Sequence, residues 1–117
     1  MDERLKKALD FSNYMVTLNN QKRVLEEKYN QELLYYHNGS QFTVTRELIN
    51  FCYTLLSTGN TEVVLVDDNK LPVQVIDLEE FHSNVLDVYF TASNSYYNEF
   101  VELKQKRTVE KLVDANE

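Results

Sequence analysis

The sequence of 117 residues has little of the two residue types that make tight turns, since it contains only two glycines and one proline. Folds built from many short strands need both types at their turns, so this composition argues against an all-β fold. Tryptophan is absent, but eight tyrosines and six phenylalanines supply large side chains for a core. We therefore expect a single domain, residues 1–117, built mainly from long helices.

Cysteine is almost absent as well. Cys52 is the sole cysteine, so no disulfide can form within the chain. It lies in the apolar stretch 48–56, where a lone thiol is usually a small core residue of a protein kept in a reducing cytosol. The sequence also lacks a Gly-rich phosphate loop, a Gly-x-Ser-x-Gly elbow and a Cys-x-x-Cys pair. We predict neither an enzyme nor a bound cofactor.

Long apolar runs are missing too. No stretch approaches the roughly 18 apolar residues that a membrane-spanning helix needs. None follows the charged residues 2–4, as a signal peptide would require. We expect a cytoplasmic protein without a membrane partner.

Basic residues are outnumbered, with 12 lysines and arginines against 19 aspartates and glutamates and a formal net charge of −7. Nucleic-acid binders need a basic face, so nucleic acid is disfavoured as a partner. Residues 62–87 hold seven acidic residues and one lysine. This segment is either a solvated face or a binding surface for a basic partner. The candidate partner-binding residues within it are Asp67, Asp68, Glu79 and Glu80.

Residues 3–37 contain no glycine or proline, and their apolar residues recur at steps of three and four, as on one stripe of a helix. We expect one helix that ends at Asn38-Gly39, with Gly39 as a left-handed C-cap. The alternative is a type I′ turn at Asn38-Gly39 that joins 32–37 to 40–45 as a hairpin. We favour the cap because the residues before it are rich in strong helix formers.

The middle of the chain alternates between helix and strand patterns. Residues 46–57 predict a second helix, with Thr45 as its N-cap and Gly59 at its end. The apolar runs 62–67 and 72–77 flank a polar turn and predict a β-hairpin.

Asp77 and Glu80 form a capping box that begins a third, long helix. The apolar stripe of that helix consists of Leu78, Phe81, Val85, Val88, Ala92, Tyr96, Phe100, Leu103, Val109 and Leu112. Helices of this length span about 50 Å, longer than a small domain is wide, so each needs a partner along its stripe. We predict an α+β, mostly helical fold with two long antiparallel helices, a short middle helix and a small β-hairpin or three-stranded sheet. Such a helix pair keeps one side uncovered, so we expect a homo-oligomer.

Two short patterns resemble metal sites without completing them. Glu79-x-x-His82 is the ligand pair of di-iron bundles, but those sites need a second such pair, and His37 has Leu34 three residues before it. Asp67-Asp68-Asn69 opens like a calcium loop and lacks the later glycine and glutamate. We predict no metal site.

Two tyrosines, Tyr35 and Tyr97, fall outside the apolar stripes of the predicted helices. Exposed tyrosines are favoured at protein interfaces, so these two join the candidate partner-binding residues. The alternative is that they are merely exposed.

Several segments resemble uncharacterised small proteins of T4-like marine cyanophages and marine viral metagenomes. They are FSNY (residues 11–14), NGSQF (38–42), ELINF (47–51), TEVVL (61–65) and VEKL (109–112). The resemblance implies a viral role in the host cytosol and carries over no catalytic residue.

Four functions compete on this reading. The first is a non-enzymatic, oligomeric interaction protein that acts in assembly or regulation, with a host or phage protein as a further partner. The second is an acidic decoy that occupies the nucleic-acid site of a host nuclease or polymerase. The third is a nucleic-acid binder that uses the basic run from Lys104 to Lys111, and the fourth is an enzyme of unrecognised type.

Overall fold

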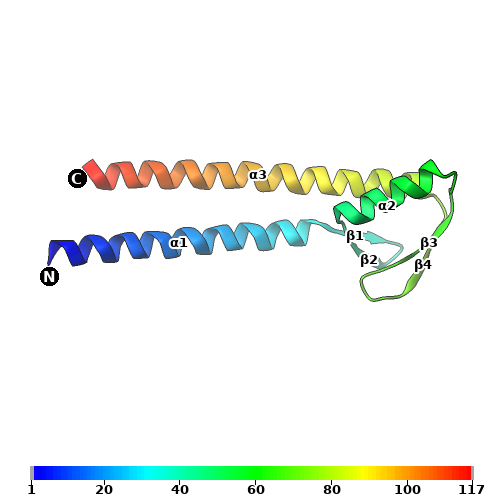
Figure 1. Ribbon diagram of the computed structural model, residues 1–117, viewed down its shortest axis with the longest axis horizontal. Helices are drawn as coiled ribbons and strands as arrows, with labels where there is room; N and C mark the ends of the chain where they lie inside the picture. Colours follow the sequence, from blue (N-terminus) through cyan, green and yellow to red (C-terminus); the bar gives the residue numbers. More distant parts are fainter. Residues whose placement is uncertain (1, 117) are drawn as a thin grey trace. The chain divides into compact units, whose positions relative to one another are not determined.

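The computed structural model describes the backbone of residues 2–116 and the side chains of residues 2–106. In chain order the described elements are α1 (Glu3–Glu32), β1 (Leu34–His37), β2 (Ser40–Thr43), α2 (Arg46–Ser57), β3 (Val63–Val66), β4 (Pro72–Val75) and α3 (Leu78–Asn116) (Figure 1). The mostly helical α+β class is confirmed. The chain divides into two compact units, which we call the helix-pair unit (Met1–Lys28 with Ser95–Glu117) and the hairpin unit (Tyr29–Asn94). That the whole chain is one domain stays a prediction.

The first hairpin corrects the predicted end of the first helix. α1 ends at Glu32 rather than at residue 37, and β1 pairs antiparallel with β2. Asn38 and Gly39 have φ values of 51° and 83°, the two positive values that a type I′ turn needs. The helix cap is therefore wrong and the hairpin alternative is confirmed. The hairpin prevails over local helix propensity because it brings Phe42 and Val44 into the core, where both are buried.

α2 begins and ends where the sequence predicts. The Leu48 N–H donates to Thr45 Oγ1 at 3.0 Å, which makes Thr45 the N-cap. At the other end the Gly59 N–H donates to the Leu56 carbonyl at 3.0 Å, with Gly59 at a φ of 89°. Both caps are thus confirmed.

The second hairpin, β3 with β4, forms a sheet of its own. The three-stranded sheet is wrong, because the described residues form two separate two-stranded sheets. Asp68, which follows β3, provides the connection between them. Its N–H donates to the Gln41 carbonyl at 2.9 Å and its Oδ1 accepts the Thr43 N–H at 3.0 Å. Because these bonds occupy backbone groups of β2, the hairpins join through one residue rather than through a continuous ladder.

α3 begins as predicted, since the Glu80 N–H donates to Asp77 Oδ1 at 3.1 Å.

The core of the molecule lies in the hairpin unit. Its buried apolar residues are Leu33, Phe42, Val44, Cys52, Leu65, Val75, Leu78, Phe81, Val85 and Ala92. The predicted α3 stripe supplies four of them, so the face of α3 that packs on the hairpins is the one that the periodicity indicated.

In the helix-pair unit, α1 and α3 run antiparallel. Lys28 forms an ion pair with Glu99, whereas Lys22, earlier on α1, holds its Nζ 5.9 Å from the ring centroid of Phe100, later on α3. The antiparallel pairing is confirmed. Nevertheless α1 has no buried residue along its 30 positions. The predicted stripe residues Val109 and Leu112 lie outside the described side chains.

Candidate functional site

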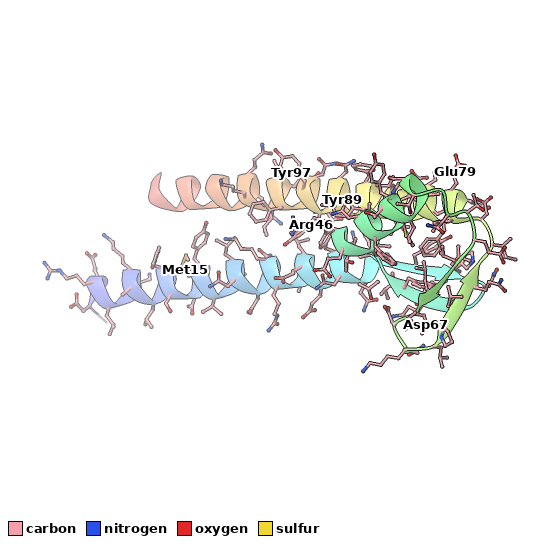
Figure 2. All side chains as sticks on the ribbon, turned by 45° about the vertical axis from the view of Figure 1, so that its right-hand side comes forward. Met15, Arg46, Asp67, Glu79, Tyr89 and Tyr97 are labelled. Carbon is pink, nitrogen blue, oxygen red and sulfur yellow. The ribbon has the colours of Figure 1, made fainter. Side chains whose placement is uncertain are left out.

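Asp67, the first candidate of the acidic segment, holds the turn between β3 and β4 (Figure 2). Its side chain is only 6 % exposed, and its Oδ1 accepts the N–H groups of Asn69 and Leu71, each at 2.9 Å. Lys70 in this turn has a positive φ of 64°, which an L residue adopts only when its surroundings fix it. The Asp67 carboxylate is therefore engaged within its own turn.

Asp68, the second candidate, is engaged between the hairpins. Its Oδ2 accepts the Thr43 hydroxyl at 2.7 Å and the Gln41 side-chain amide at 2.9 Å, in addition to the backbone bond to Oδ1. Desolvation raises the pKa of Asp68, but the hydrogen bonds from Thr43 and Gln41 outweigh it, so this pKa lies below its ordinary value. The ionised form is the one that the fold stabilises.

Glu79 and Glu80, by contrast, are exposed on the first turn of α3. Figure 2 labels Glu79 there. Acidic side chains at this end of a helix complement its partial positive charge, as the Asp77 cap also does. These two carboxylates remain accessible from solvent.

The two candidate tyrosines have different surroundings. Tyr35 is half-buried in β1, where its hydroxyl accepts the Asn84 side-chain amide at 3.0 Å and its ring lies edge-on to Phe81 at 5.5 Å. Tyr97 is 68 % exposed on the α3 segment of the helix-pair unit (Figure 2). Tyr35 thus borders the core and Tyr97 faces solvent.

The structure brings Tyr35 and Glu80 together at one cavity of the hairpin unit. The cavity has a volume of about 300 Å³ and lies between the β1–β2 turn and the start of α3. Its lining consists of Tyr35, Tyr36, His37, Asn38, Asp77, Glu80, Phe81 and Asn84. None of the other four candidate residues belongs to this lining.

Sequence reasoning did not single out five polar members of this cavity as binding residues: Tyr36, His37, Asn38, Asp77 and Asn84. The missed signal is the Asn38-Gly39 turn. A strand before that turn puts alternate residues on one face, which would have placed Tyr35 and His37 side by side.

The groups that could do covalent or metal chemistry do not gather. Burial raises the pKa of the Cys52 thiol to about 11, so the thiol stays protonated at neutral pH. His82 is half-buried, with its ring 6.2 Å from that of Tyr53. Among the residues whose side chains are described, no three His, Cys, Asp or Glu side chains lie together as metal ligands would.

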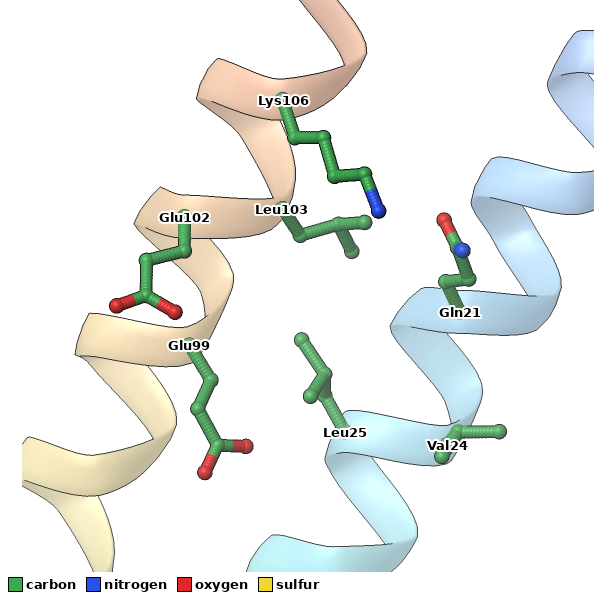
Figure 3. Close-up of a pocket in the computed structure, with 7 residues that line it drawn as sticks. All are labelled: Gln21, Val24, Leu25, Glu99, Glu102, Leu103 and Lys106. Atoms are coloured by element: carbon green, nitrogen blue, oxygen red, sulfur yellow. The ribbon is translucent and has the colours of Figure 1, made fainter.

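A second hollow lies in the helix-pair unit, as a groove of about 390 Å³ along the seam between α1 and α3 (Figure 3). It is lined by Gln21, Val24, Leu25, Glu99, Glu102, Leu103 and Lys106. Leu103 and Lys106 reach from α3 toward Gln21 and Leu25 of α1. A hydrogen bond from Lys28 lowers the pKa of Glu99, so the carboxylate on this rim is ionised.

Large apolar side chains stand exposed along α1 in the same unit. They are Leu5, Leu9, Phe11, Met15, Val16 and Val24. Exposed apolar residues are ordinary when scattered, but each of these six, all on the part of α1 within this unit, is at least 36 % exposed.

Comparison with known proteins finds no match, whether to a protein family, to a curated protein or to a solved structure. Within the part of the chain that the structure describes, no helix combines the length and the apolar character needed to cross a membrane.

Proposed function

We propose that this is a non-enzymatic protein that self-associates through its helix-pair unit and acts as an assembly or regulatory factor. The observation that supports this most is that α1, 30 residues long, fully buries none of its side chains, while six of its large apolar side chains are exposed. A helix in a globular protein obtains most of its stability from packing an apolar face. A second copy of the chain would supply that packing.

Charge favours the helix-pair unit as the contact between copies. That unit holds ten acidic and ten basic residues, whereas the hairpin unit holds nine acidic and two basic residues. The formal charge of −7 therefore belongs to the hairpin unit. Two helix-pair units can approach without net repulsion, while two hairpin units repel each other.

The residues that line the groove between α1 and α3 suggest how two copies would align in the proposed dimer. Glu102 and Lys106 are one helical turn apart among the residues that line this groove. Across a two-fold axis, Glu102 of one copy can face Lys106 of the other, and the reverse contact follows by symmetry. Val24 and Leu25 lie in the same lining and would supply the apolar centre.

A matched pair of valine substitutions tests where the copies meet. Val24→Lys in the helix-pair unit and Val64→Lys in the hairpin unit each place a charge at an exposed valine, 56 % and 64 % exposed respectively. We expect Val24→Lys to weaken self-association at least about tenfold and Val64→Lys to leave it unchanged. Light scattering after size-exclusion chromatography measures both, and equal effects would contradict the proposal.

A charge reversal tests the register. Glu102→Lys alone should weaken self-association by about two- to tenfold, since exposed pairs contribute little each. Adding Lys106→Glu to the same chain restores opposite charges across the axis and should restore the affinity. A double variant weaker than the single one would exclude this arrangement.

The origin and setting belong to the proposal as well. The resemblance to cyanophage proteins favours a phage-encoded chain that acts in the host cytoplasm.

The acidic decoy of a host nuclease or polymerase is the second candidate, and the concentration of charge in the hairpin unit favours it. Pull-down from cyanobacterial lysate with a salt step tests it: a nuclease or polymerase subunit released by high salt supports the decoy, and recovery of this chain alone contradicts it.

A further inference from the structure

The cavity at the start of α3 has two walls from distant parts of the sequence. β1 and its turn supply one wall and the first two turns of α3 supply the other. Because side chains alternate along a strand, Tyr35 and His37 share one face of β1, and both rings lie edge-on to Phe81, at 5.5 and 5.4 Å. A volume of about 300 Å³ is at the lower end for ligand sites and suits one side chain or one small ion.

The charges of the lining residues indicate which kind of ion the cavity binds. Asp77 and Glu80 are both among the lining residues, although Asp77 Oδ1 also accepts the Glu80 N–H, and no lysine or arginine is among the lining residues. The start of α3 opposes the two carboxylates with only about half a positive charge. The balance stays negative, so the cavity favours a cation.

The lining also favours a flat cation with several donors. Asn84 lines the cavity and donates its amide to the Tyr35 hydroxyl at 3.0 Å, and the same side chain carries an amide oxygen that can accept. The rings of Tyr35 and His37 add aromatic surface to the same wall. A guanidinium group is planar, donates five N–H bonds and packs on aromatic rings, whereas an ammonium group is a point charge.

We infer that this cavity binds a guanidinium group, held by Asp77 and Glu80 and packed against Tyr35. The inference goes beyond the proposed self-association, since the site lies within the hairpin unit and needs no second copy. The guanidinium comes from an arginine of a protein partner or from a small free molecule, and both present the same chemistry.

The test is a titration of the full chain with N-acetyl-arginine methylamide, followed by amide NMR signals of Asn84 and Phe81. N-acetyl-citrulline methylamide, which has the same shape without the charge, is the control ligand. We expect a saturable shift with the arginine probe and less than about a tenth of that shift with citrulline at the same concentration. A shift that rises without saturation, or equal shifts with both probes, would overturn the inference.

Two glutamates of the same helical turn supply matched variants. Glu80→Gln removes a lining carboxylate and keeps a residue that a capping box accepts, so folding is preserved. Glu79→Gln removes an exposed carboxylate outside the lining. We expect Glu80→Gln to weaken the probe about tenfold and Glu79→Gln to leave it unchanged. Equal weakening would mean general charge attraction and would also overturn the site.

A short peptide, Gly-Gly-Arg-Gly-Gly, distinguishes the two sources. Binding at least about tenfold tighter than that of the capped arginine would assign the site to an arginine of a protein partner. Equal binding would assign it to a small guanidinium compound. Failure of the self-association tests changes neither result, because these titrations concern the hairpin unit alone.

Discussion

The Asp68 carboxylate accepts both the backbone N–H and the hydroxyl of Thr43, at 3.0 and 2.7 Å, across a separation of 25 residues. Thr43 ends β2, and Asp68 follows β3. One side chain thus connects two hairpins that share no strand ladder. The stability of the hairpin unit should therefore depend on this residue more than on its exposed acidic neighbours.

Replacing Asp68 by alanine removes the acceptor of three hydrogen bonds. We expect Asp68→Ala to lower the free energy of unfolding by about 1–2 kcal/mol, because bonds to a charged acceptor are stronger than neutral ones but these lie near solvent. Urea denaturation measures the change. Glu79→Ala, an exposed carboxylate of the same acidic segment, is the control and should change it by less than about 0.5 kcal/mol. Equal effects would contradict the role of Asp68.

The contribution of Asp68 to the free energy of unfolding should vanish at low pH. Its pKa in the folded chain lies below the ordinary value of 3.8, so the folded state binds this proton less readily than the unfolded state does. The stabilisation is therefore complete well above that value and is lost as the pH falls through the lower, folded pKa. We expect the difference between the wild type and Asp68→Ala to be constant from pH 7 to about pH 5 and to shrink below about pH 4. A difference that grows on acidification would contradict the sign.

The turn at Asn38-Gly39 can be tested through its backbone conformation. Gly39 has a φ of 83° and open space around it, so Gly39→Ala suffers no collision and its penalty is conformational. We expect a loss of about 1 kcal/mol in thermal or urea unfolding. Asn38→Gly, whose φ of 51° a glycine adopts freely, is the control and should change stability by less than about 0.5 kcal/mol. A neutral Gly39→Ala would argue for another turn.

The thiol of Cys52 should report on unfolding. It is buried and its pKa is about 11, so an aromatic disulfide reagent at pH 8 should modify it only as fast as the chain opens. A Cys52→Ala chain that carries Asn50→Cys, an exposed position of the same helix, should react at least about a hundredfold faster. Equal rates in the folded protein would show that Cys52 is accessible.

The sequence correctly predicted the helix starts that depend on hydrogen bonds between residues close together in the chain. Thr45 and Asp77 were both identified as N-caps, and each accepts the expected backbone N–H. The Asn38-Gly39 turn was not preferred, because the strand before it has helix-forming neighbours and its pairing depends on burying Phe42 among residues far along the chain. Local helix and strand propensities do not include the free energy gained when a side chain is buried against residues far along the chain.

The candidate acidic residues show the same difference between what the local sequence predicts and what only the fold decides. Glu79 and Glu80 were expected to be exposed and are exposed. Asp67 and Asp68 belong to the same acidic run, yet their carboxylates are bound within the hairpins, to partners that include Thr43, 25 residues earlier. Composition describes the charge of a segment, and only the fold decides which of its carboxylates remain accessible.

Self-association is the central claim, and sedimentation equilibrium of the full chain tests it most directly. The protein should be measured from about 1 to 100 µM at physiological salt, a range that covers ordinary homodimer affinities. We expect the mass to rise with concentration from 13.8 kDa to at least twice that value. A constant mass of 13.8 kDa over the whole range would contradict the account.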